Sequence, residues 1–110
     1  MAKLTRQDVI SRVEASESLE GEDLSGLDLT GADLTTANLN RACLRDTNLN
    51  RADLTEANLI SSDLTGANLN EANLNNADLT EANLRWANLT GAFYNKSQLE
   101  NSMYVDKAIL

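Results

Sequence analysis

A leucine recurs at every fifth position over most of the chain. From Leu24 to Leu89, fourteen leucines follow one another at this interval without exception, and Leu19 shares the same phase. From Leu34 onward, the residue two positions before the leucine is small and usually alanine, and along the whole run the residue directly before the leucine is almost always aspartate or asparagine. The two positions after the leucine are mostly polar and variable. The consensus is therefore A-(D/N)-L-x-x.

An interval of five fits neither of the two regular secondary structures. In an α-helix, five residues turn the chain by about 500°, so successive leucines would point to every side of the axis. In a straight strand, side chains alternate, so leucines at an odd spacing would fall on opposite faces. The chain must turn once in each pentad, with the small residue and the leucine inward, the Asp or Asn outward and the two polar residues at the corner. Equal turns wind into coils, and stacked coils pair their backbones and place leucine on leucine.

The pentads are similar to those of a known family. The stretch ADLTTANLNRACLRDTNLNRADLTEANL, residues 32–59, resembles the pentapeptide repeat family, and the resemblance covers residues 17–106. It implies an all-β solenoid, a right-handed quadrilateral β-helix with about 20 residues in each coil and about 4.5 coils in this chain.

The segment before the repeats predicts a short α-helix over about residues 6–15. Thr5 and Asp8 have the spacing of a capping box, and Leu4 and Val9 have the spacing of a hydrophobic staple. We expect the apolar face of this helix to lie on the first coil. The predicted organisation is a capping helix at 1–16, the repeats at 17–106 and a tail at 107–110.

The C-terminal end differs in composition, because all four aromatic residues lie there: Trp86, Phe93, Tyr94 and Tyr104. Tyr94, Leu99 and Tyr104 keep the leucine phase, so the repeat is expected to continue with larger core residues. Phe93 and Met103 take the outward position that Asp or Asn holds elsewhere. These apolar side chains require a cover, which is either the tail Val105–Leu110 folded across them or a second molecule.

Two further apolar residues stand at corners, where polar residues are the rule. Ile60 directly follows its leucine, and Trp86 comes two positions after its own. Together with the two outward apolar residues, they complete the candidate protein interface: Ile60, Trp86, Phe93 and Met103.

Composition narrows the class of protein. Aromatic residues make up only 4% of the chain, so the core must be aliphatic. The formal net charge of −8 predicts no direct nucleic-acid binding, because an anionic surface repels phosphates. The single cysteine, Cys43, cannot form an intramolecular disulfide and fits a reducing compartment. With no apolar run typical of a secretory signal or a membrane span, we expect a cytoplasmic protein and no membrane contact.

The sequence offers little catalytic chemistry. It contains no histidine, and Cys43 has no second cysteine with which to form a zinc or nucleophilic site. The carboxylates arise from the repeat and are not expected to converge in a cleft. A packed solenoid also predicts no pocket. We therefore expect no catalytic residue, no cofactor and no metal.

The sequence predicts a non-enzymatic scaffold or protein-interaction module of unknown partner, either monomeric or a homodimer joined end to end at its C-terminal end. The resemblance implies an alternative, because some pentapeptide repeat proteins are acidic mimics of duplex DNA that bind type II topoisomerases such as gyrase. Over about 22 Å, duplex DNA carries about 13 phosphates. When pentads are assigned to four faces, each face nets only −1 or −2, so no face concentrates the charge. This distribution favours the interaction module.

Overall fold

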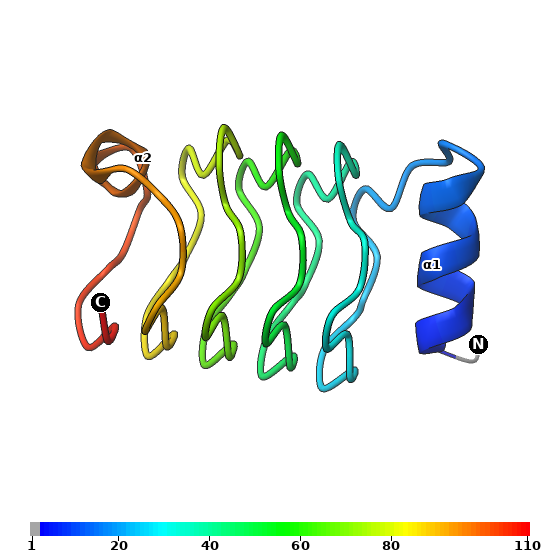
Figure 1. The fold of residues 1–110 in the computed structure, drawn as a ribbon, viewed down its shortest axis with the longest axis horizontal. Helices are drawn as coiled ribbons and strands as arrows, with labels where there is room; N and C mark the ends of the chain where they lie inside the picture. The colour runs from blue at the N-terminus through cyan, green and yellow to red at the C-terminus, as the bar shows by residue number, and fades with distance from the viewer. Residues whose placement is uncertain (1–2) are drawn as a thin grey trace.

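The computed structural model describes residues 3–110, and in it the chain winds into a stack of coils with a short helix at each end (Figure 1). Helix α1 spans Arg6–Glu14 at the N-terminal end of the stack, and α2 spans Lys96–Glu100 at the opposite end, near the C-terminus. The molecule extends 33 Å along its longest axis and 24 and 21 Å along the others. The two similar short axes reflect coils of nearly equal width and depth.

Isolated parallel β-bridges join successive coils. In the regular part of the stack, these bridges link residues 20 apart in the sequence, from Asp23–Cys43 to Asn73–Phe93. Because the chain turns in every pentad, only the residue before each core position forms a bridge. The predicted solenoid is thus built from single bridged residues, and the structure adds α2, which the leucine pattern did not predict.

In the regular part of the stack, three backbone hydrogen bonds connect each pentad to the next coil. The N–H of Leu49 donates to the carbonyl of Asn68 at 2.7 Å, and the N–H of Arg51 donates to the carbonyl of Asn70 at 2.9 Å. In return, the N–H of Asn68 donates to the carbonyl of Thr47 at 2.9 Å. In each pentad, two backbone N–H groups therefore donate to the following coil and one donates to the preceding coil. Consequently, the N-terminal edge of the stack presents mainly carbonyls, and the C-terminal edge presents mainly N–H groups.

Each corner is a β-turn, and its shape explains the polar residues around the leucine. The N–H of Ala32 donates to the carbonyl of Leu29 at 3.0 Å, which closes the turn. The third turn residue has a positive φ in every pentad from Gly21 to Gly91, as a type II turn requires. The Asp or Asn before the leucine accepts the N–H two residues later, as Asn58 Oδ1 does from Ile60 at 3.0 Å.

The core consists of the stacked leucines and the small residues beside them. Every leucine of the phase from Leu19 to Leu89 is at most 1% exposed. Thr47 and Ser62 replace alanine in this core, and their hydroxyls donate to the carbonyls of Leu44 and Leu59 at 2.8 Å. These hydrogen bonds allow a small polar side chain in an aliphatic core.

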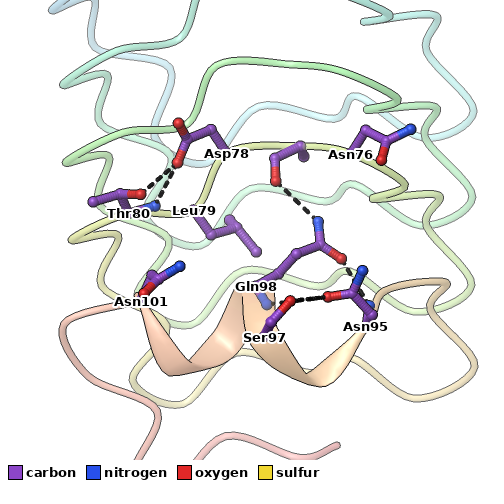
Figure 2. A pocket seen from close by; sticks show the side chains of 9 residues that line it. Asn76, Asp78, Leu79, Thr80, Asn95, Ser97, Gln98 and Asn101 are labelled. Atoms are coloured by element: carbon purple, nitrogen blue, oxygen red, sulfur yellow. Dashed lines mark hydrogen bonds between the residues drawn. The ribbon is translucent and has the colours of Figure 1, made fainter.

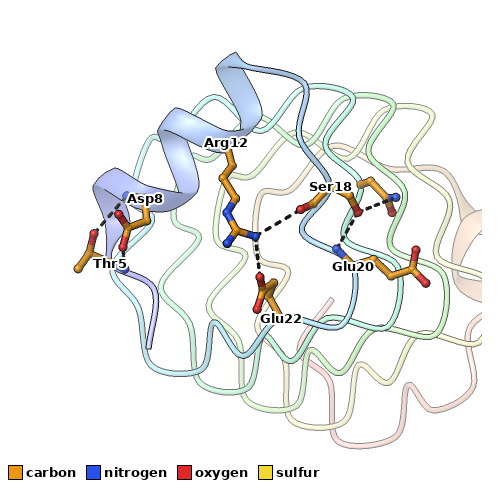
Figure 3. A network of polar contacts seen from close by, with 7 residues as sticks. Thr5, Asp8, Arg12, Ser18, Glu20 and Glu22 are labelled. Atoms are coloured by element: carbon orange, nitrogen blue, oxygen red, sulfur yellow. Dashed lines mark hydrogen bonds and ion pairs between the residues drawn. The ribbon is translucent and has the colours of Figure 1, made fainter. Parts of the chain in front are cut away.

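Helix α1 begins with the predicted capping box. Thr5 Oγ1 accepts a hydrogen bond from the N–H of Asp8 at 3.1 Å, and Asp8 Oδ2 accepts one from the N–H of Thr5 at 2.8 Å (Figure 3). Val9 is fully buried in the same core as the leucines, and Leu4 packs against that core. The apolar side of α1 therefore lies on the stack.

Arginines of α1 bind the N-terminal edge of the stack. The guanidinium of Arg6 donates to the carbonyls of Asp28 and Thr30, each at 2.9 Å. Arg12 pairs with Glu22 at 2.6 Å on another side of the first coil (Figure 3). Cations suit this edge because its unpaired backbone groups are mainly carbonyls.

The register of the stack changes after α2. Asn83 bridges to Tyr104, so the interval is 21 residues where the regular interval is 20. The N–H of Met103 donates to the carbonyl of Ala82, while the carbonyl of Tyr104 accepts from Leu84. Two residues thus occupy the place of one, as in a β-bulge. The prediction that Tyr104 lies in the core is wrong, since this residue takes the outward bridge position and is 41% exposed.

Candidate protein interface at the C-terminal end

Large apolar side chains are exposed at the C-terminal end of the stack. We define this C-terminal apolar surface by seven residues that are each between 40% and 63% exposed: Trp86, Phe93, Met103, Tyr104, Val105, Ile109 and Leu110. Elsewhere in residues 3–110, the large apolar side chains are buried or half-buried. Among the described residues, the exposed large apolar side chains are therefore confined to one end of the stack.

The structure places the four predicted interface residues in two regions. Trp86, Phe93 and Met103 belong to the C-terminal apolar surface. Ile60 is half-buried in the middle of the stack, where its carbonyl accepts a hydrogen bond from the N–H of Arg41 at 2.9 Å. Ile60 is thus separated from the other three residues and forms part of a corner in the middle of the stack.

The apolar side chains of the last coil occupy positions that are polar in earlier coils. Phe93, Tyr104 and Ile109 each form the outward bridge residue on a different side of this coil. Their bridge partners in the coil before are all asparagines: Asn73, Asn83 and Asn88. The surface thus extends around the sides of the last coil as well as over its end.

Contacts with charged residues hold the tail on the last coil. The Arg85 guanidinium lies 4.5 Å from the centroid of the Tyr104 ring, within the range of a cation–π contact. Its Nε lies 3.5 Å from a carboxylate oxygen of Asp106. Lys107 Nζ lies 5.2 Å from the centroid of the Trp86 ring. These contacts fix the path of the tail without covering the apolar surface.

The tail extends the stack and does not shield it. Ile109 bridges to Asn88, so the tail completes part of the last coil. Phe93 remains 60% exposed and Met103 55% exposed. The alternative in which the tail folds across these two side chains is therefore wrong. Sequence reasoning missed Ile109 and Leu110 as surface residues because it treated the tail only as a cover.

Apart from Asp8, whose pKa is lowered by hydrogen bonds from Thr5 at the start of α1, the carboxylates with perturbed pKa values lie at the corners of the coils. The hydroxyl and N–H of Thr55 donate to Asp53 at 2.5 and 3.0 Å and lower the pKa of this carboxyl. Burial alone would raise the pKa of Asp63, but hydrogen bonds from Thr65 and Arg45 outweigh it and leave that pKa lowered. In the described residues 3–110, no group of three His, Cys, Asp or Glu residues could hold a metal ion. These perturbed carboxylates therefore belong to the turns of the fold.

A groove lies between the stack and α2, contrary to the expectation of a solenoid without pockets. Its volume is about 280 Å³, and coil residues 76–80 line it opposite α2 (Figure 2). Helix α2 begins with a capping box of Asn95 and Gln98, whose side chains and backbone N–H groups bond reciprocally. The sequence NKSQ contains this signal, which the leucine phase obscured.

Coils of five-residue turns around a leucine core define a repeat solenoid. The protein belongs to the pentapeptide repeat family, since the family's sequence model, described as pentapeptide repeats, matches residues 18–51 and 57–93 in eight copies. Among curated proteins, no match was found. Between residues 3 and 110, no helix combines the length and the apolar character needed to cross a membrane.

Several solved structures share this architecture. The pentapeptide repeat protein Rfr23 of the cyanobacterium Cyanothece 51142 is 40% identical, with a TM-score of 0.74 over 79% of this chain and 59% of its own. HetL of Nostoc sp. strain PCC 7120 is 38% identical, with a TM-score of 0.66 over 80% of this chain and 38% of its own. The Nostoc PCC 7120 protein alr5209 is 28% identical, with a TM-score of 0.82 over 99% of this chain and 98% of its own. This chain thus spans less than two thirds of Rfr23 and HetL but nearly all of alr5209.

Proposed function

We propose that this protein is a non-enzymatic interaction module whose C-terminal apolar surface binds another protein, and that a second copy of the chain is the first candidate. The observation that carries this proposal is that, within residues 3–110, the exposed large apolar side chains are confined to one end of the molecule. Exposed apolar side chains concentrated at one end of a protein are typical of interaction sites.

The size of the end face supports a weak association. The two short axes of 24 and 21 Å give an end face of about 500 Å², so two copies meeting end to end would bury about 1,000 Å² in total. This area is near the lower limit for a specific interface. We therefore expect a homodimer that dissociates on dilution.

Regulation by binding is the role that we propose for such a module. HetL is involved in the regulation of heterocyst differentiation, and its likeness to this chain supports a regulatory function. The surface charge argues against the DNA-mimic alternative. A 33 Å length of duplex DNA carries about 19 phosphates, whereas the chain has a net charge of −8. Ion pairs with arginines also engage several of its carboxylates, among them Glu22, Asp63 and Glu71.

We further propose the finer features of the fold. The family and the regular 20-residue bridge interval support right-handed coils, about 4.5 in number. The buried contact of Val9 supports a capping role for α1, which would prevent association at the N-terminal end.

Light scattering of the wild type and of Phe93→Asp tests the proposed self-association. We expect the wild type to approach twice the 12.0 kDa chain mass at high concentration and Phe93→Asp to remain monomeric, because a carboxylate at this position opposes an apolar contact. Asn73→Asp is the matched control, since Asn73 is the bridge partner of Phe93 in the coil before and gains the same charge. If the wild type is monomeric throughout, the homodimer is excluded. If Phe93→Asp associates as strongly as Asn73→Asp, the C-terminal apolar surface is not the interface.

A further inference from the structure

The shifted register gives residues of the tail a place in the core of the last coil. Tyr104 and Ile109 occupy bridge positions. The residues that follow them, Val105 and Leu110, therefore take the places that leucines hold in earlier coils. The N–H of Ala108 donates to the carbonyl of Val105 at 3.0 Å, which closes a corner like those of the regular stack. The tail thus ends the stack with two apolar residues in the core phase.

The last coil therefore has one core residue on each of its four sides. We define these four residues as the terminal layer: Tyr94, Leu99, Val105 and Leu110. The first two are half-buried, and the last two are 40% and 63% exposed. In the first coil, by contrast, the four residues in these places are fully buried: Leu19, Leu24, Leu29 and Leu34. Within residues 3–110, the terminal layer lacks the cover that the first layer has.

Helix α1 shows what kind of element covers such a layer. Its Val9 is fully buried in the core, and Leu4 and Val13 pack against the same core. At the rim, Arg6 donates to two backbone carbonyls of the first coil. An amphipathic helix thus buries the first layer with its apolar side, and its polar side chains bind the backbone edge.

The backbone edge beside the terminal layer has the opposite polarity and requires acceptors. In the coil before, the N–H groups of Glu71 and Leu74 donate to backbone carbonyls at 2.9 and 2.8 Å. Gly91 and Tyr94 hold the same places one coil later. In the part of the chain that the structure describes, neither of their N–H groups donates to a backbone carbonyl. Carboxylates are strong acceptors for such donors.

The side-chain charges at this end also favour an acidic partner. Residues 84–110 carry three cationic side chains and only two carboxylate side chains, although the whole chain has a net charge of −8. Arg85 pairs with Asp106, whereas within residues 3–110 neither Lys96 nor Lys107 has an ion pair. Two copies joined end to end would set donors against donors and lysines near lysines. An acidic partner therefore matches this end better than a second copy does.

We propose that the terminal layer binds an acidic amphipathic helix of a partner protein, laid across this end of the stack as α1 is laid across the other (Figure 1). The proposal rests on the interaction function proposed above and names a partner that displaces the second copy. A helix of about 15 residues is about 22 Å long, which matches the end face of 24 by 21 Å. Its leucines would cover the terminal layer, and its carboxylates would accept from the N–H groups of Gly91 and Tyr94.

Amide NMR of the ¹⁵N-labelled full chain tests this proposal with two synthetic helical peptides, acetylated and amidated at their ends. Both carry the same leucines, flanked by Glu or by Lys: ELAALEAELAALEAE and KLAALKAKLAALKAK. We expect the Glu peptide to bind about fivefold more tightly at 0.15 M salt, where long-range repulsion by the anionic chain is screened. We expect it to shift the amide protons of Gly91 and Tyr94 downfield, as new hydrogen bonds do. The net charge of the chain alone predicts the reverse order of affinity.

Two neighbouring tail variants control for location. Leu110→Asn removes an apolar side chain from the terminal layer and should weaken binding of the Glu peptide about tenfold. Ile109→Asn alters a bridge residue that faces the side of the coil and should change the affinity less than about twofold. Both side chains are more than half exposed, so neither change removes a buried contact. The proposal is overturned if the Lys peptide binds as tightly as the Glu peptide, if neither binds at millimolar concentration, or if both variants weaken binding equally.

Light scattering separates this proposal from the homodimer. We expect the Glu peptide to dissociate a wild-type dimer, because both bind the terminal layer. A monomeric wild type that binds the Glu peptide would exclude the homodimer and support the helix. A wild-type dimer that persists with saturating Glu peptide would overturn the helix proposal and leave the homodimer intact.

Discussion

Residues at the third position of each corner carry the backbone strain of this fold. Five of these positions hold glycine, which adopts a positive φ at little steric cost. The others hold residues with a Cβ, and Thr36, with φ 61°, is β-branched. A left-handed conformation costs a non-glycine residue about 1–2 kcal/mol. At most of these positions the stack offsets this cost because the N–H pairs with the next coil, as Thr36 does with Thr55 at 2.9 Å.

Replacing Thr36 with glycine should therefore stabilise the protein. The gain from relieved strain exceeds the added entropy of the unfolded chain, so we expect the free energy of unfolding to rise by about 0.5–1 kcal/mol. The matched control is Thr35→Gly, because Thr35 precedes Thr36 in the same corner and its φ is not positive. The control should lower the stability by about 0.5–1 kcal/mol. Urea denaturation compares the two, and equal losses would contradict the strain assigned to Thr36.

Helix α1 illustrates how an element is matched to the polarity of the edge that it covers. Inside the stack, the carbonyls of Asn48 and Asn50 accept backbone N–H groups from the preceding coil. The carbonyls of Asp28 and Thr30 hold the same places in the first coil, where no coil precedes them. Arg6 supplies the missing donors from its guanidinium. One side chain thus replaces part of a coil.

The change Arg6→Met tests this role. It keeps an unbranched side chain of helix-forming type but removes both donors, so we expect the free energy of unfolding to fall by about 1–2 kcal/mol. Gln7→Met is the control, because Gln7 Nε2 donates only within α1, to Ser11 at 3.0 Å. The control should change stability by less than about 0.5 kcal/mol. Thermal unfolding and amide exchange of α1 measure the stability of the two variants. Equal losses of stability in Arg6→Met and Gln7→Met would show that Arg6 contributes no more than an ordinary surface residue.

For the whole molecule, the five-residue period predicted the core and the corners because each pentad obeys the same steric rule. It did not predict α2, because Leu99 keeps the leucine phase while the local capping box of Asn95 and Gln98 favours a helix. The bulge at Met103 and Tyr104 shifts the register by one residue without a mark in the sequence.

The candidate interface was also predictable only in part. Apolar residues at outward positions identified Phe93 and Met103 directly, because the rest of the repeat places Asp or Asn there. The exposure of Ile109 and Leu110 could not be inferred, since it depends on the shifted register. The groove beside α2 was likewise hidden, because it forms between a coil and a helix that the leucine phase did not predict.

The turn aspartates should also make the stability of the whole stack depend on pH. Hydrogen bonds from the residue two positions later lower the pKa of Asp23, Asp28 and Asp53, and those from Thr65 and Arg45 lower that of Asp63. A carboxyl with a lowered folded-state pKa binds protons more weakly when folded. Its stabilising contribution is thus present above the unfolded-state value of about 3.9 and is lost as pH falls through the lower folded-state pKa. We expect the thermal midpoint of the wild type to fall steeply below about pH 4.

A variant with asparagine at these four positions separates the turn carboxylates from general charge effects. Asparagine still accepts the turn N–H, as Asn58 does, so the fold should persist while the acid-dependent fall in the thermal midpoint becomes shallower. The control carries four glutamines in place of glutamates, with the same change in net charge: Glu14, Glu56, Glu81 and Glu100. It leaves the turn carboxylates in place and should retain the steep fall. The contrary outcome is that the thermal midpoints of both variants fall as steeply as that of the wild type between pH 5 and pH 3. In that case the four turn aspartates do not cause the loss of stability in acid.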